Sequence, residues 1–168
     1  MLDTIDLHIL SLLQENARLS IVELANRVGL SASPCSRRVK LLEERGVIRR
    51  HVSLLDATQV GLPVSVFVSV TLERQIETAL QRFEEAVSSY PEVMECYLMT
   101  GVSDYMLRVV VPDLEAYQRF LLDRLTQIPG VANIQSSFAL KQVQYKTALP
   151  LAPSEFTGER KRPVSEVS

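Results

Sequence analysis

Cysteine is scarce in this sequence, tryptophan is absent, and no long hydrophobic run occurs. The two cysteines, Cys35 and Cys96, fit neither a disulfide framework nor a Cys–His metal spacing, so we expect free thiols and no metal site. Without a long apolar run there is no candidate membrane span. Acidic residues stand among the first apolar ones and no basic segment precedes them, which argues against a signal peptide. These absences predict a cytoplasmic protein.

The length and the composition are those of a folded protein. A chain of 168 residues makes one domain or two small ones. With 46% hydrophobic and 23% charged residues, disorder, collagen and low complexity are excluded for most of it. The sequence from Pro153 onward is polar and bounded by prolines, and we expect residues 151–168 to be a disordered tail.

Charge is unevenly distributed along the chain. The whole sequence carries −2, but residues 27–50 hold seven basic and two acidic residues, a net charge of +5. A uniformly basic nucleic-acid binder is therefore excluded, whereas a local basic module facing phosphate is not. Charge alone fits equally well a solvated helix face that happens to be basic.

Three helices are predicted in residues 1–50. The first carries Ile5 and Ile9 on one face and can be capped by Asp3 or Thr4. The second begins with a capping box, Ser20-x-x-Glu23, and ends before Gly29. The third can be capped by Ser31, with a proline in its first turn and Cys35 on its inner face, where a thiol packs as a small apolar group.

The second and third helices, joined by a tight turn, form a helix-turn-helix pattern. In such a motif the second helix enters the major groove of DNA, and Arg and Lys contact phosphates. The alternative is a three-helix packing unit without a ligand. The outer face of the third helix is basic and rich in hydroxyls, which favours DNA binding. The predicted DNA-binding residues are Ser31, Ser33, Pro34, Ser36, Arg37, Arg38, Lys40, Arg49 and Arg50.

Residues 51–63 are interpreted as a linker, because they end in turn residues. After them, Val64–Leu72 alternates apolar and polar residues with period 2, which predicts a strand. A helix from about residue 76 follows, with Ile76 on its core face, and then strands at about 93–100 and 104–111. A second helix has Leu114 among its core residues, and a strand from 131 ends the series. The predicted order over residues 64–150 is therefore β-α-β-β-α-β.

An internal repeat supports this order. A shift of 38 residues places Ile76 on Leu114 and Phe83 on Leu121, and each half enters its last strand through Pro-x-Val. Two such β-α-β units predict a ferredoxin-like antiparallel sheet with both helices on one face. Phe67 would lie on the open face, which favours pairing of two such sheets. The predicted fold class is α+β, with an N-terminal helix-turn-helix domain and a C-terminal αβ-sandwich.

The segment between the two central strands combines small polar groups with a glycine. Gly101 permits an unusual backbone angle or the close approach of a ligand. Thr100, Ser103 and Asp104 could together hold the amino group of an amino acid. Their spacing alone favours the simpler alternative, a turn with solvated polar groups.

The sequence resembles the Lrp/AsnC family of bacterial and archaeal transcription regulators. The resemblance runs from residue 2 to about 150. It is carried by Leu2-Asp3-x-Ile5-Asp6, by Ser31-x-Ser33-Pro34-Cys35-x-Arg37-Arg38 on the predicted helix-turn-helix, and by Gly101-x-x-Asp104-Tyr105.

The resemblance implies a winged or extended helix-turn-helix, joined to a domain that senses a small molecule. It also implies dimers made through the second domain, which assemble further to tetramers or octamers, and a palindromic operator in double-stranded DNA. The effector implied is an amino acid, leucine or another apolar one, bound between dimers. The residues implied to line its pocket are Met99, Thr100, Gly101, Val102, Ser103, Asp104 and Tyr105, with Ser136 and Ser137 of the last strand nearby.

The sequence fits other classes of protein less well than a transcription regulator. No Ser–His–Asp order, P-loop or metal cluster marks an enzyme, and His8 and His51 are interpreted as surface or linker side chains, so no catalytic residue and no cofactor are predicted. A stand-alone amino-acid-binding module leaves the helix-turn-helix unexplained. An architectural oligomer that wraps DNA without an effector remains the alternative function.

Overall fold

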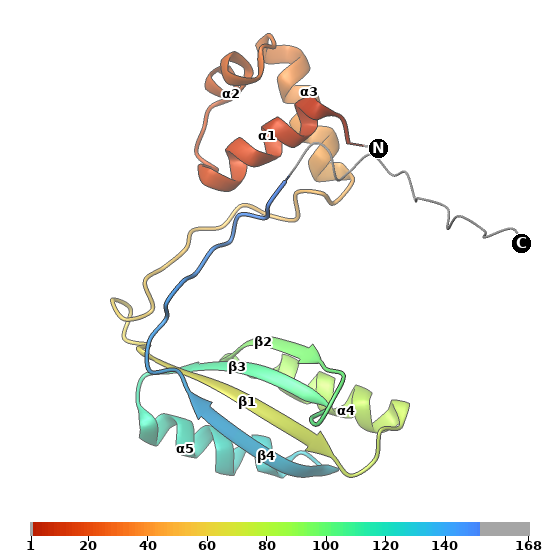
Figure 1. Cartoon of the computed structure of the whole chain (residues 1–168), viewed down its shortest axis with the longest axis vertical. Coiled ribbons are helices and arrows are strands. Elements are labelled where there is room, and N and C mark those ends of the chain that lie inside the picture. The colour runs from red at the N-terminus through yellow and green to blue at the C-terminus, as the bar shows by residue number, and fades with distance from the viewer. Residues whose placement is uncertain (1, 152–168) are drawn as a thin grey trace, which may run out of the picture. The chain divides into compact units, whose positions relative to one another are not determined.

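The computed structural model describes residues 2–151, which form two compact units (Figure 1). One unit holds residues 2–53 together with residues 144–151, and the other holds Leu54–Val143. The predicted disordered tail, apart from Leu151, lies outside the described residues. The domain boundaries predicted from the sequence, 1–50, 51–63, 64–150 and 151–168, stay a prediction.

The N-terminal unit contains three helices with clear end signals. They are α1 (Thr4–Glu15), α2 (Ile21–Val28) and α3 (Ala32–Glu44). Asp3 caps α1 by accepting the Asp6 N–H at 2.8 Å. The predicted capping box of α2 is confirmed, since Ser20 Oγ accepts the Glu23 N–H while Glu23 Oε2 accepts the Ser20 N–H. Gly29 then ends α2 with φ at +72°, a left-handed angle that glycine adopts without strain.

These three helices share a small apolar core. Its buried members are Ile9, Leu10, Leu24, Ala25, Cys35 and Leu42. The prediction that Cys35 belongs to the core is confirmed, because its side chain is fully buried. Burial also raises the pKa of the Cys35 thiol, which keeps it protonated and unreactive.

The second unit is one four-stranded sheet with two helices. Its elements are β1 (Val64–Leu72), α4 (Glu77–Ser88), β2 (Val93–Leu98), β3 (Tyr105–Val111), α5 (Leu114–Asp123), a short 3₁₀ helix η1 (Leu125–Gln127) and β4 (Val131–Phe138). The strand order is β2-β3-β1-β4 and every pair is antiparallel. The predicted ferredoxin-like topology is therefore confirmed.

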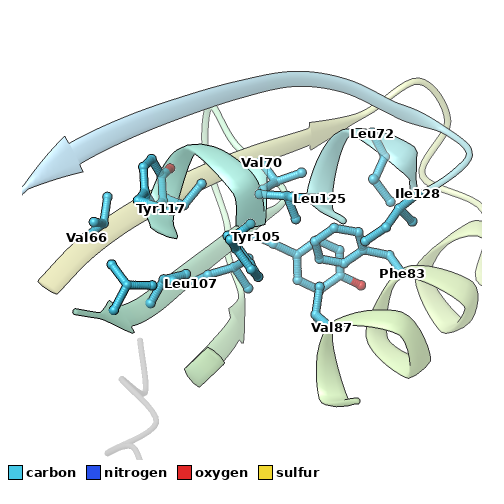
Figure 2. Packing of buried hydrophobic residues seen from close by; sticks show 14 residues of the cluster. Val66, Val70, Leu72, Phe83, Val87, Tyr105, Leu107, Tyr117, Leu125 and Ile128 are labelled. Atoms are coloured by element: carbon cyan, nitrogen blue, oxygen red, sulfur yellow. The ribbon is translucent and has the colours of Figure 1, made fainter. Parts of the chain in front are cut away.

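Both helices cover the same face of this sheet (Figure 1). The alternating valines Val66, Val68 and Val70 of β1 point to that face and are fully buried. Figure 2 shows how Phe83 of α4 lies against Tyr105 of β3, with ring centroids 4.5 Å apart. The alternation read from β1 thus places the core on one face and leaves the other open.

Two predicted core positions of the helices are instead exposed. Ile76 is 52% exposed and Leu114 is 64% exposed. The reason is their position at the helix starts, since Ile76 is the residue before α4 and Leu114 is the first residue of α5. At these positions the side chains do not yet face the sheet. None of the helices in residues 2–151 is long and apolar enough to cross a bilayer.

Candidate functional site

The exposed face of α3 carries a continuous polar and basic stripe. Ser36, Arg37 and Lys40 stand three, four and seven residues after Ser33, so the four residues lie on one face of the helix, and all are exposed. Arg37 has no ion-pair partner among the described residues, and Lys40 meets only Glu44, at 3.7 Å in solvent. The stripe therefore presents hydroxyl groups and positive charge to an outside ligand.

The start of α3 is exposed in the same way. Ser31 stands at the N-cap position, as predicted, but its hydroxyl makes no capping hydrogen bond, so the predicted side-chain cap is wrong. Ser31 and Pro34 are both exposed. The first turn of α3 consequently keeps its backbone donors and the Ser31 hydroxyl open to a partner.

Arg38 differs from its neighbour Arg37, because it already holds two acids. Its Nη1 donates to Asp3 Oδ2 and to Asp6 Oδ1, each at 2.7 Å. The two ion pairs fix α3 against the start of α1. The hydrogen bond from the Asp6 N–H and, after it, the one from Arg38 lower the pKa of the Asp3 carboxyl. The predicted contact of Arg38 with phosphate stays a prediction, and the structure gives this side chain an anchoring role.

A hollow beside α3 extends the basic surface. Its volume is about 390 Å³, and it is lined by Asp6, Pro34, Arg37, Arg38, Leu41, Leu42 and Arg45. Arg49 and Arg50 follow α3 and are exposed as well, while the next residue, His51, has its Nε2 3.1 Å from Glu43 Oε1. All the arginines and lysines of this surface lie on α3 or within the six residues that follow it.

The loop that joins β2 to β3 has an exposed part and a buried part. Met99 is 43% exposed and Val102 is fully exposed, and Thr100 and Gly101 are exposed beside them. Gly101 has φ at +124°, an angle that side chains rarely adopt, and no atom lies within 4 Å of where a Cβ would stand. This end of the loop thus offers apolar side chains and free backbone in open space.

Asp104 forms the buried part of the loop together with Tyr105. Its Oδ2 accepts the Leu72 N–H at 2.7 Å, and its Oδ1 accepts from Gln75 Nε2 at 2.5 Å. Only 6% of Asp104 is exposed. The interpretation of this segment as a turn of solvated polar groups is therefore wrong for Asp104, because its carboxylate ties the loop to the end of β1.

Tyr105 is also a supporting residue. It is 1% exposed, packs against Phe83, and its hydroxyl donates to Glu84 Oε1 at 2.7 Å. Burial first, and then Glu84, raise the pKa of the Tyr105 phenol. In this structure its ring belongs to the sheet–helix core (Figure 2), so it braces the loop from beneath.

The two serines of β4 do not meet this loop within one chain. Ser136 lies opposite Val68, whereas Val70 lies opposite Tyr105, so Ser136 is two positions further along. At strand spacings this means roughly 7 Å along the strand and roughly 10 Å across the sheet. Ser136 faces α5, where it hydrogen bonds with the Tyr117 hydroxyl, and Ser137, opposite Phe67, is on the open face.

Sequence analysis missed Gln75 and Glu84, the residues that hold Asp104 and Tyr105. No motif marks either of them, because their roles arise only when the chain after β1 folds back beside the loop. The one available signal concerned Gln75 alone, a polar residue between the end of β1 and the start of α4.

The open face of the sheet combines an aromatic residue with an ion pair. Phe67 is 41% exposed and lies opposite Arg108. Arg108 Nε donates to Glu95 Oε1 at 2.6 Å, and the Tyr97 hydroxyl donates to the same carboxylate at 3.0 Å. Burial raises the pKa of Glu95, but these two hydrogen bonds outweigh it and lower the pKa. Among the described residues, no group of three His, Cys, Asp or Glu side chains could hold a metal ion.

The arrangement defines a class of protein, a DNA-binding regulator with a separate sheet domain. Residues 2–49 match the winged helix-turn-helix DNA-binding family, and residues 65–149 match the Lrp/AsnC ligand binding domain. The chain therefore belongs to the Lrp/AsnC family, whose named members are transcriptional regulators and not enzymes, as the sequence predicted.

Three similar proteins illustrate this membership. The Bkd operon transcriptional regulator of Pseudomonas aeruginosa is 53% identical over 150 residues, which are 89% of this chain and 98% of that protein. The leucine-responsive regulatory protein of Escherichia coli is 38% identical over 88% of this chain and 90% of its own length. The solved complex of the Neisseria meningitidis regulator NMB0573 with L-Met is 43% identical, with a TM-score of 0.85 over 90% of this chain and 97% of that one.

Proposed function

We propose that this regulator senses a free apolar amino acid at the loop of residues 99–105, closed by a second copy of the sheet domain, and that binding alters its affinity for an operator. The observation that carries the proposal is the exposed end of this loop. Val102 is fully exposed and Gly101 has open space above its backbone, so no other part of residues 2–151 covers them.

The chemistry of the loop suits an amino acid. Such a ligand has an ammonium and a carboxylate a few ångströms apart, and an apolar side chain. Backbone and hydroxyl donors at Thr100, Gly101 and Ser103 suit the carboxylate. Met99 and Val102 offer an apolar wall. Asp104 is the acceptor predicted for the ammonium, and because a carboxylate has about four acceptor sites, it can accept this bond besides the two it already holds.

A second copy of the chain completes the site in this proposal. Ser136 and Ser137 are too far along β4 to close the loop of their own chain, so a second sheet must supply the cover. The exposed Phe67 on the open face supports such pairing. We infer a homodimer that assembles further to a tetramer or octamer. The relative from Neisseria meningitidis, solved with L-Met, supports an apolar amino acid as the effector.

Operator binding is assigned to the exposed face of α3. Replacing Arg37 or Lys40 with Ala should each flatten the plot of log affinity against log salt by about one unit, because each loses one phosphate contact. A symmetric dimer should prefer a palindromic operator, with half-sites one helical turn or a multiple of it apart. Fluorescence anisotropy with a labelled duplex measures both. An unchanged slope in either variant removes that residue from the interface.

The effector site is tested by isothermal titration calorimetry of the full chain with L-methionine and L-leucine. The variant Gly101→Val fills the open space above the loop, and Gly61→Val is the matched control. Gly61 also has a positive φ, +78°, and open space, but it lies in the linker. We expect heat from the wild type and from Gly61→Val, and none from Gly101→Val.

Two outcomes would contradict this function. If none of the twenty amino acids releases heat or changes DNA affinity, the protein does not sense amino acids. The remaining function is then that of an architectural oligomer that wraps DNA. If Gly101→Val binds as the wild type does, the effector site lies elsewhere in the chain.

A further inference from the structure

The chain returns to the DNA-binding unit after the sheet is complete. Residues 144–151 belong to the same compact unit as α1–α3, although 90 residues separate Gln144 from Ser53. Most of the returning segment is unpacked, since Leu140 is fully exposed and Val143 is 88% exposed. At its end, Leu149 and Leu151 make contacts with the helices.

Gln14 of α1 forms hydrogen bonds with both backbone groups of Leu149, the N–H and the carbonyl. The Leu149 N–H donates to Gln14 Oε1 at 2.6 Å, and Gln14 Nε2 donates to the Leu149 carbonyl at 3.2 Å. A side-chain amide can satisfy both backbone groups of one residue only when that residue is extended and correctly oriented. Pro150 favours this extended form of Leu149, because a proline disfavours the helical conformation of the residue before it.

An apolar contact accompanies the two hydrogen bonds. Leu151 is partly buried and packs against the core of the three helices. The docked segment therefore uses the same combination of backbone pairing and one apolar anchor that is found when a short peptide binds an extended site. Here the peptide is the protein's own chain.

We infer that residues 149–151 form a latch on α1, which gives the DNA-binding unit a second attachment to the sheet domain besides the linker of residues 51–63. The second attachment continues directly from β4, the strand that carries Ser136 and Ser137. Only ten residues lie between Phe138 and Leu149. A change at β4 is thus passed along the chain to α1. This role in coupling rests on the proposed amino-acid sensing, whereas the latch itself does not.

The latch is tested by hydrogen exchange with mass spectrometry on the full-length protein. Gln14→Ala removes both hydrogen bonds, yet Ala is a better helix former than Gln, so α1 is kept. Losing them should speed exchange in the peptide of residues 144–151 by about five- to thirty-fold. Glu15→Ala, which changes the next and exposed residue of α1, is the control and should leave this peptide unchanged. Equal exchange in the wild type and Gln14→Ala overturns the latch.

Its coupling role is tested on the same variants, with L-methionine and L-leucine as probes. Gln14→Ala should still release heat with the probe and still bind DNA, but the probe should change its DNA affinity by a smaller factor than in the wild type. The coupling role is overturned if the probe changes the DNA affinity of Gln14→Ala by the same factor as in the wild type while hydrogen exchange shows that the latch is open. If the wild type itself shows no response to the probes, the sensing function fails instead, and the exchange result still decides the latch. Leu151→Ser, which weakens the apolar anchor, should behave as Gln14→Ala does.

Discussion

Asp104 provides a direct test of the difference between a ligand contact and a loop anchor. In the structure its carboxylate accepts the Leu72 N–H at 2.7 Å and Gln75 Nε2 at 2.5 Å, in a nearly buried position. Asp104→Ala removes both acceptors and leaves the buried Leu72 N–H without a partner. Asp104→Asn keeps one oxygen for Leu72, and Gln75 can turn its amide to accept from the new NH₂ group.

The two variants should therefore differ clearly in stability. A hydrogen bond to a charged acceptor contributes about 1.5–3 kcal/mol, and an orphaned buried donor costs about 1–3 kcal/mol. Since these contributions overlap, we expect Asp104→Ala to lower the free energy of unfolding by about 2–4 kcal/mol. Asp104→Asn should lower it by about 1 kcal/mol. Asp123→Ala is the control, because Asp123 is an exposed residue at the end of α5, and it should stay within about 0.5 kcal/mol of the wild type.

Urea unfolding followed by far-UV circular dichroism measures these differences, and hydrogen exchange locates them. With a slope of about 1–3 kcal/mol per molar, a loss of 3 kcal/mol moves the midpoint by about 1–3 M. Exchange of the Leu72 amide should accelerate in Asp104→Ala and stay slow in Asp104→Asn. If Asp104→Ala unfolds at the wild-type midpoint but no longer binds an amino acid, the anchoring argument is refuted, and Asp104 acts only on the ligand.

Three further predictions concern the helices and the open sheet. Arg38→Ala should lower the stability of the DNA-binding unit by about 1–2 kcal/mol through loss of its two ion pairs, whereas Arg37→Ala should change it by less than about 0.5 kcal/mol, as thermal unfolding will show. In the folded protein the pKa of the Asp3 carboxyl is below its ordinary value of 3.8, so the stability that it contributes is complete above that pH and is lost as the pH falls through the lowered pKa. The difference in unfolding temperature between the wild type and Asp3→Ala should therefore disappear between pH 6 and pH 2. A constant difference would exclude the charge of Asp3 as its cause. Phe67→Glu should reduce the oligomer size measured by light scattering, while Leu114→Glu, at a more exposed residue on the helix-covered side, should not.

Local signals were sufficient to predict the fold. The capping box at Ser20 and the left-handed Gly29 mark the helix-turn-helix, and the valine alternation in β1 marks the buried face of the sheet. These features depend on neighbours three or four residues away in a helix, or two away in a strand. Sequence analysis therefore located the helices and strands within a few residues.

Long-range pairings could not be predicted in the same way. Nothing in the sequence around Arg38 indicates that its Nη1 forms ion pairs with Asp3 and Asp6, which lie more than thirty residues earlier. The bond between Gln14 and Leu149 spans 135 residues and involves backbone atoms, which carry no residue-specific pattern. Such contacts decide which polar residues of a predicted site remain open to a ligand.

The Gly-x-x-Asp-Tyr segment shows why a motif and a binding surface need not coincide. Of its three fixed residues, Asp104 and Tyr105 point into the fold, where they hold β1 and α4, and only Gly101 stands in open space. The exposed side chains, Met99 and Val102, are those the fold does not constrain. The motif thus specifies the shape of the loop. Under the proposed function, the choice among amino acids then depends on the exposed side chains and on the second copy proposed to cover them. Exchanging Met99 or Val102 should change which amino acid is preferred while leaving the protein folded.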